Sequence, residues 1–138
     1  MSQVKFTCRY LLLTVLLCAV GAGVYAQFEV LDSFPQNLQL YPRNLQTNQG
    51  TVRIKGTLEM GTPYQSVRLI VTRDNNKSFF SSNYSFPVSS IDIPLANRSF
   101  NTAYQLPAEL RAYRFQLFGI NNGVQSALPL VSAENVVS

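Results

Sequence analysis

The sequence predicts an all-β domain, a sandwich of about seven strands that follows an N-terminal signal peptide. Apolar and polar residues alternate along most segments, and turn residues separate these segments roughly every 8–15 residues, as expected for a sandwich. No stretch beyond the N-terminus shows the i, i+3, i+4, i+7 spacing of an amphipathic helix, so helix should be nearly absent. Hydrophobic residues form 46% of the 138 residues and charged residues 13%, which suits one packed domain and excludes a disordered chain.

The N-terminus has the pattern of a secretory signal peptide. Lys5 and Arg9 supply its positive start, and the next 17 positions are uncharged, mostly apolar and end in small residues. We expect cleavage before Gln27, which divides the chain into a signal peptide, 1–26, and a β-sandwich module, 27–138. An uncleaved membrane anchor is the alternative, since about 20 apolar residues span a bilayer. Cleavage predicts a secreted or cell-surface protein without a stable membrane anchor.

The composition of the module excludes several kinds of chemistry. The chain has no histidine, and both cysteines, Cys8 and Cys18, lie in the signal peptide, which excludes a Ser–His pair, a cysteine nucleophile and a His/Cys zinc site. The module also lacks a disulfide and must be held together by its core. Its nine Lys and Arg residues are dispersed among seven Asp and Glu, which argues against a nucleic-acid partner. We expect no cofactor and no metal.

Carboxylates are the remaining candidates for catalysis. A glycosidase needs two of them about 5–10 Å apart, so a small two-carboxylate enzyme is one hypothesis. The run Asp74-Asn75-Asn76 begins like a calcium loop but lacks the later Gly and Glu ligands, and we interpret it as a turn. All seven carboxylates stand singly in different segments, and we interpret them as solvated surface residues: Glu29, Asp32, Glu59, Asp74, Asp92, Glu109 and Glu134.

The first two strands are predicted within residues 50–61 and 66–73. In each run apolar residues occupy alternate positions, which gives one buried and one wet face. Gly56 interrupts the first run and indicates a bulge or a close approach of another chain segment. The second run ends at the Asp74 turn, and we expect the two strands to pair as a hairpin.

The remaining strands are predicted in the second half of the module. Residues 90–93 alternate as far as Pro94, residues 102–106 are a weaker candidate, residues 111–121 form the strongest strand, and 128–137 form the last. The Asn121-Asn122-Gly123 turn reverses the chain between the last two. From the alternating positions we expect a core made of Val52, Ile54, Val67, Leu69, Val71, Tyr113, Phe115 and Leu117.

The strongest strand also carries a motif of a particular kind of sandwich. Leu110, Tyr113, Phe115 and Leu117 have the spacing at which immunoglobulin-like and fibronectin-like sandwiches place a tyrosine corner, a buried ring whose hydroxyl bonds upstream backbone. A simple aromatic residue in an alternating strand is the alternative. Residues 106–110 before it have room for one short helical turn. The predicted fold class is therefore an immunoglobulin/fibronectin-like β-sandwich.

One segment, residues 75–90, interleaves aromatic residues with serine and asparagine. Rings beside hydroxyl and amide groups are suited to contact sugars, so Phe79, Phe80 and Tyr84 are candidate glycan contacts. The alternative is that these rings cap the core of the sandwich. Three Asn-X-Ser patterns would accept N-glycans in a eukaryotic secretory pathway, at Asn76, Asn83 and Asn97.

Five segments, in this order, resemble the immunoglobulin-like module that precedes the catalytic domain in exported bacterial sialate O-acetylesterase-like SGNH hydrolases, especially those from Bacteroidetes: 38–45, 50–59, 67–74, 106–120 and 133–138. They share the pattern of a β-sandwich and a few distinctive residues, such as Tyr41-Pro42-Arg43. In that family the last segment leads directly into the hydrolase, whose nucleophile block, oxyanion residues and Asp–His pair have no counterparts here. No catalytic role is therefore carried over to any residue of this chain.

The resemblance implies a function in combination with another domain. Our leading expectation is a non-catalytic accessory module of a secreted carbohydrate-active esterase or hydrolase, which positions a downstream hydrolase domain missing from this chain and contacts glycan. The alternative is a stand-alone secreted or surface domain for adhesion or binding.

Overall fold

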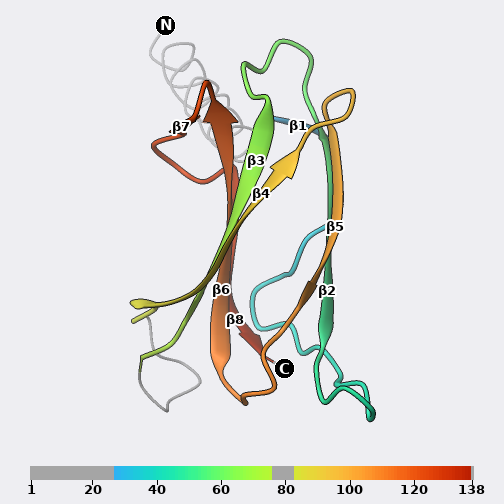
Figure 1. Ribbon diagram of the computed structural model, residues 1–138, viewed down its shortest axis with the longest axis vertical. Helices are drawn as coiled ribbons and strands as arrows, with labels where there is room; N and C mark the ends of the chain where they lie inside the picture. Colours follow the sequence, from blue (N-terminus) through green and yellow to red (C-terminus); the bar gives the residue numbers. More distant parts are fainter. Residues whose placement is uncertain (1–26, 76–82, 138) are drawn as a thin grey trace, which may run out of the picture.

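The computed structural model describes residues 27–75 and 83–137, which form an all-β sandwich of two antiparallel sheets (Figure 1). One sheet has the order β1-β2-β5. In the other, β4, β3 and β6 lie side by side, and both β7 and β8 pair with β6. The strands are β1 (Phe28–Ser33), β2 (Thr51–Leu58), β3 (Ser66–Arg73), β4 (Phe86–Pro94), β5 (Ser99–Gln105), β6 (Ala112–Asn121), β7 (Val124–Gln125) and β8 (Val131–Val137).

This arrangement confirms the predicted fold class, with eight strands in the described residues where about seven were expected. Two strands have no counterpart among the predicted ranges: β1, and β7, which has only two residues and lies just after the predicted Asn-Asn-Gly turn. The described residues contain no helix, so none of them forms one long and apolar enough to cross a membrane. The predicted signal peptide, 1–26, lies outside the described residues.

The predicted hairpin of β2 and β3 is wrong. β2 pairs with β1 and β5, whereas β3 pairs with β4 and β6, so the two strands belong to different sheets. Residues 59–65 between them pass from one sheet to the other, and Gly61 adopts a φ of 91° in this connection. Alternation predicts which face of a strand is buried, but both strands bury one face against the same core whether they pair or oppose each other.

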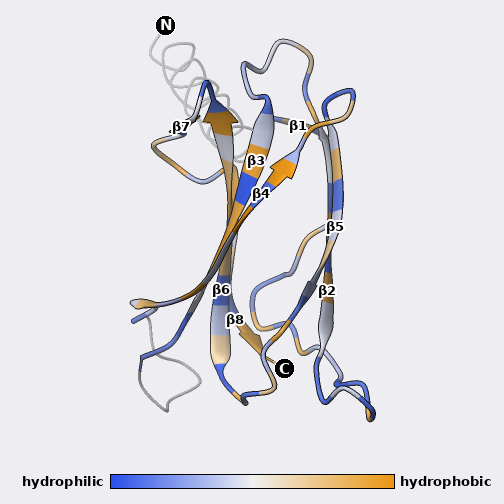
Figure 2. Ribbon diagram, in the orientation of Figure 1, coloured by the Kyte–Doolittle hydropathy of each residue, from blue (hydrophilic) through white to orange (hydrophobic). Residues whose placement is uncertain are grey.

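The core lies between the two sheets and contains all eight residues predicted for it, each with an exposed fraction of 0%. Hydrophobic and hydrophilic residues alternate in bands along the strands that enclose it (Figure 2). The rings of Tyr104 on β5 and Phe115 on β6 join the sheets edge to face, with centroids 5.6 Å apart. Burial of these apolar side chains is the main force that holds the two sheets together.

Gly56 allows a close approach, as its place in the alternating pattern predicts. A Cβ atom at this position would lie 2.8 Å from Cζ of Phe100 and 2.9 Å from the carbonyl oxygen of Val30. Phe100 packs against Phe28 across the same sheet, with ring centroids 6.2 Å apart. Only glycine lets β1, β2 and β5 come together around these rings.

After β1 the chain leaves its own sheet and crosses to the other. The N–H of Leu38 donates to the carbonyl of Glu134 at 3.1 Å, and the N–H of Tyr41 donates to the carbonyl of Val137 at 2.8 Å. Leu40 and Val137 form an isolated parallel bridge. The segment 36–41, which we call the crossing segment, therefore covers the free edge of β8.

Candidate functional site

Tyr113 forms the predicted tyrosine corner. Its ring is fully buried, and its hydroxyl donates to the backbone carbonyl of Glu109 at 3.0 Å. Burial raises the pKa of the Tyr113 hydroxyl to about 12, and the negative charge of Glu109 adds to this rise. The corner fixes the loop before β6, which brings the Glu109 side chain to one end of the sandwich.

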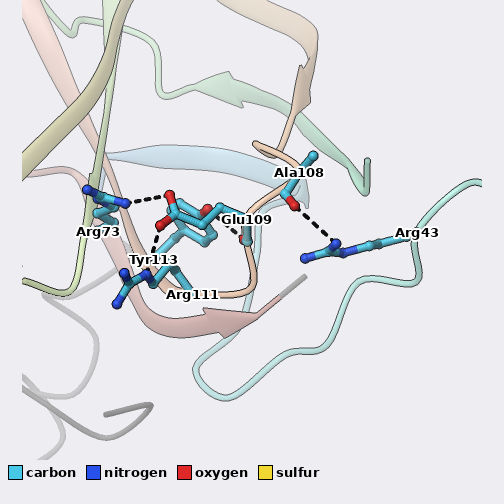
Figure 3. A network of polar contacts seen from close by, with 6 residues as sticks. All are labelled: Arg43, Arg73, Ala108, Glu109, Arg111 and Tyr113. Atoms are coloured by element: carbon cyan, nitrogen blue, oxygen red, sulfur yellow. Dashed lines mark hydrogen bonds and ion pairs between the residues drawn. The ribbon is translucent and has the colours of Figure 1, made fainter. Parts of the chain in front are cut away.

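Arginine side chains surround this loop in a network of polar contacts (Figure 3). Arg111 Nε donates to the carboxylate of Glu109 at 3.0 Å, and Arg73 at the end of β3 forms a second ion pair with it. The hydrogen bond from Arg111 and the charge of Arg73 hold the pKa of the Glu109 carboxyl below its usual value. On the other side, Arg43 donates to the carbonyl of Ala108 at 3.1 Å.

Beside this network lies a small cavity of about 290 Å³. Arg73, Glu109 and Tyr113 line one part of it, and Phe86 lines another. The guanidinium of Arg73 stacks 4.0 Å from the centre of the Phe86 ring. Because Arg73 is engaged by both a carboxylate and a ring, we assign the network a structural role in tying β3, β4 and the loop before β6 together.

A larger polar groove of about 550 Å³ lies between the crossing segment and the start of β8. Its walls include Asp32, Asn37, Gln39, Tyr41 and Ser132. Burial raises the pKa of the Tyr41 hydroxyl. The groove combines donors, acceptors and an aromatic residue, which is the composition of a binding site for a small polar ligand.

Of the three predicted glycan-contact residues the structure describes Tyr84, and this residue does not line the polar groove. Tyr84 is only 4% exposed, and its hydroxyl donates to Oδ1 of Asn135 at 2.7 Å and accepts from the Asn135 N–H at 2.9 Å. Asn135 has a φ of 54° and lies at an irregularity in the pairing of β8 with β6. The hydroxyl of Tyr84 therefore stabilises the bulge in β8, and the guanidinium of Arg114 lies 5.3 Å from the centre of its ring. Tyr84 is not one of the residues that form the core between the sheets.

Phe79 and Phe80 lie outside the described residues, so their contact with glycan stays a prediction. The same holds for glycosylation at Asn76. The two other candidate acceptors, Asn83 and Asn97, are exposed. Asn97 lies in the tight turn before β5, with a φ of 49°.

The interpretation of the carboxylates is correct except at Asp74, which is buried at 2% exposure. Its N–H donates to the carbonyl of Ala112 at 3.0 Å, which extends the pairing of β3 and β6 by one residue. Asp74 thereby continues the face of β3 that carries Ile70 and Thr72, opposite to the core face of that strand. Other carboxylates pair with separate cations: Glu29 with Arg98, Asp32 with Lys55, Asp92 with Arg68 and Glu134 with Arg114. Among residues 27–75 and 83–137, no group of three or more Asp, Glu, His or Cys could hold a metal ion.

The alternating pattern of apolar residues does not predict the polar groove. Asn37 and Gln39 belong to a run of amides, 36–39, that has no strand pattern, and only the crossing segment brings it against β8. Comparison of the chain with protein-family models, with curated proteins and with solved structures gives no match.

Proposed function

We propose that the sandwich is a non-catalytic accessory module of an exported carbohydrate-active esterase or hydrolase, in which it positions a neighbouring catalytic domain and contacts glycan. The proposal rests on the resemblance of the chain to such modules. One structural observation supports the positioning role in particular: β8 is hydrogen-bonded to neighbours on both sides as far as Val137.

β8 has a neighbour on each side at its C-terminal end. Val137 lies opposite Ala112 of β6, and its N–H donates to the carbonyl of Gln39 at 3.0 Å while its own carbonyl accepts from Tyr41. A domain attached after this strand would start from a backbone whose position and direction are set by two neighbours. A rigid exit point of this kind orients a second domain, whereas a flexible tail only tethers it.

The genomic reading frame beyond Ser138 is the first test. Continuation into a serine-hydrolase block is the expected result, and a stop codon directly after Ser138 in an intact gene would contradict the proposal.

The second test measures positioning in the two-domain protein. Three glycines inserted after Ser138 should lower turnover of a polymeric glycan ester while leaving turnover of a small soluble ester unchanged. The matched control inserts the same residues in the exposed turn at Asn122, away from the exit point. If the unaltered protein and both insertion variants turn over the polymeric ester at the same rate, the module does not position the catalytic domain.

A stand-alone binding or adhesion domain is the second candidate, and the polar groove favours it. A volume of about 550 Å³ lies within the usual range of small-molecule sites, about 300–1,000 Å³. The two candidates share the need for a ligand contact and differ in the need for a neighbouring domain.

A further inference from the structure

We infer that the polar groove between the crossing segment and β8 is a carbohydrate subsite that binds a neutral, hydroxyl-rich sugar unit. The inference deepens the proposed function, on whose carbohydrate context the choice of ligand class rests. Four features of the groove carry it: two oriented amides, a carboxylate, an aromatic residue and a strained turn that holds the amides in place.

Each of the two amides is oriented by a backbone N–H. Oδ1 of Asn37 accepts from the N–H of Glu134 at 2.8 Å, and Oε1 of Gln39 accepts from the N–H of Gln36 at 2.8 Å. A backbone N–H only donates, so the atom that faces it must be the amide oxygen. Both amide nitrogens are then turned away from these N–H groups, and because both side chains line the groove, we expect their N–H donors to serve a molecule bound there.

The groove also presents acceptors. The carboxylate of Asp32 lines it and is 44% exposed, and the ammonium of Lys55 lies 3.7 Å away, beyond hydrogen-bond distance. The carboxylate therefore keeps lone pairs for a ligand. Hydroxyl groups of Ser132 and Tyr41 both donate and accept.

The chemistry of the walls selects the ligand class. A sugar hydroxyl donates one hydrogen bond and accepts others, so adjacent hydroxyls match the amide donors of Asn37 and Gln39 together with the acceptor at Asp32. Tyr41 is partly buried against the core and lines the groove, and we expect the part of its ring that faces the groove to contact the C–H groups of the sugar. The described residues that line the groove include no lysine or arginine, and their one charged side chain, Asp32, is already paired with Lys55, so the groove offers no cation to an anionic ligand such as a phosphate or a sugar acid.

Backbone strain at the rim supports a binding role. Leu38 has a φ of 64° in the turn closed by the hydrogen bond from Gln39 N to Gln36 O, a place where glycine or asparagine is normal. Its side chain is 65% exposed, so core packing does not explain the leucine. Two contacts to Glu134 hold the turn, one from the Leu38 N–H and one at the Asn37 oxygen. Strained turns fixed in this way are concentrated where side chains must be held for a ligand.

The test is titration of the exported chain with neutral oligosaccharides, namely xylohexaose, mannohexaose and cellohexaose, with sialyllactose as the charged comparison. Backbone amide chemical shifts report where binding occurs. We expect at least one neutral probe to shift resonances of 32–41 and 131–134, and sialyllactose to leave them unchanged.

Two substitutions remove the donors and keep the scaffold. Asn37→Asp and Gln39→Glu retain the oxygen that accepts from the backbone N–H but replace the amide nitrogen with a second oxygen. Each should weaken binding about tenfold, the equivalent of one hydrogen bond of about 1.4 kcal/mol. Gln46→Glu, an exposed amide outside the groove, makes the same change of charge and should bind as the unaltered chain does.

The inference fails if none of the neutral probes binds, if the shifts map to another face, or if both donor variants bind like Gln46→Glu. Shift mapping uses the unaltered chain, so it decides the question even if a variant does not fold. None of these results bears on the reading frame or on the effect of glycines after Ser138, so failure of the groove is distinguishable from failure of the accessory role.

Discussion

Tyr113→Phe tests the tyrosine corner, because it removes one hydroxyl from a fully buried ring and leaves the ring in the core. The hydroxyl donates to the Glu109 carbonyl at 3.0 Å, and loss of such a bond costs about 1 kcal/mol in free energy of unfolding. The same hydroxyl also makes stability depend on alkaline pH, since its pKa rises from 10.0 in a model peptide to about 12 in the folded protein.

The direction of the pH effect follows from proton binding. Between pH 10 and about 12 the folded state holds a proton on Tyr113 that the unfolded state has released. The stabilisation is therefore complete below the unfolded pKa and is lost as the pH rises through this range. A rise of the pKa from 10.0 to about 12 corresponds to a loss of about 3 kcal/mol in the free energy of unfolding across this pH range.

Urea unfolding of the two proteins from neutral to alkaline pH measures both effects. At neutral pH Tyr113→Phe should be less stable by about 1 kcal/mol, and in alkali its stability should fall less steeply than that of the unaltered protein. Tyr64→Phe, which removes a hydroxyl from a half-buried ring, is the matched control and should keep the steep alkaline decline. If the free energy of unfolding of Tyr113→Phe declines as steeply in alkali as that of the unaltered protein, the Tyr113 hydroxyl does not have a raised pKa.

Three further changes test other parts of the structure. Phe115→Ala should lower the free energy of unfolding by about 3–5 kcal/mol in urea denaturation, and an unchanged melting temperature would exclude Phe115 from the core. Gly119→Ala places a Cβ 2.5 Å from the Tyr64 ring and should cost about 1–3 kcal/mol, with a smaller loss in a Tyr64→Leu background; equal losses in both backgrounds would contradict the contact. Glu109 has a lowered pKa, so its stabilisation is present above its unfolded pKa and lost as the pH falls. Glu109→Gln should flatten that acid decline in urea titrations, and an unchanged decline would show that Arg73 and Arg111 do not stabilise the carboxylate.

Alternation and turn residues predicted much of this fold because both are local signals. The apolar face of a strand is set by neighbours two residues away, so Val67, Leu69 and Val71 could be placed in the core without knowledge of their partners. The tyrosine corner is also local, since Tyr113 bonds a residue only four positions upstream.

Pairing across the sandwich could not be predicted in the same way. Whether β2 and β3 pair or face each other depends on the connection at 59–65 and on the competing edges of β5 and β6, which are distant in sequence. Asp74 was misjudged for a related reason: a carboxylate beside a turn is normally solvated, whereas Asp74 pairs with Ala112 of a strand distant in sequence and is buried.

The polar groove has no local signature at all. Asn37 and Gln39 acquire their orientation from the Glu134 and Gln36 N–H groups, and the strain at Leu38 is visible only in the backbone. A run of amides between two strands is typical of an ordinary loop. Its role as the wall of a groove follows from the crossing of the chain between the sheets.

The rigid exit of β8 and the groove both depend on the crossing segment, and native-state hydrogen exchange tests it most directly. The Tyr41 N–H of the crossing segment donates to the Val137 carbonyl of β8 at 2.8 Å, and the Val137 N–H donates to the Gln39 carbonyl of the crossing segment at 3.0 Å. Because both amides are hydrogen-bonded, we expect them to exchange slowly, at rates comparable to that of the Leu117 amide within β6. Exchange of both at the rate of an unstructured peptide would show that the segment does not hold β8, and would contradict the positioning role and the groove together.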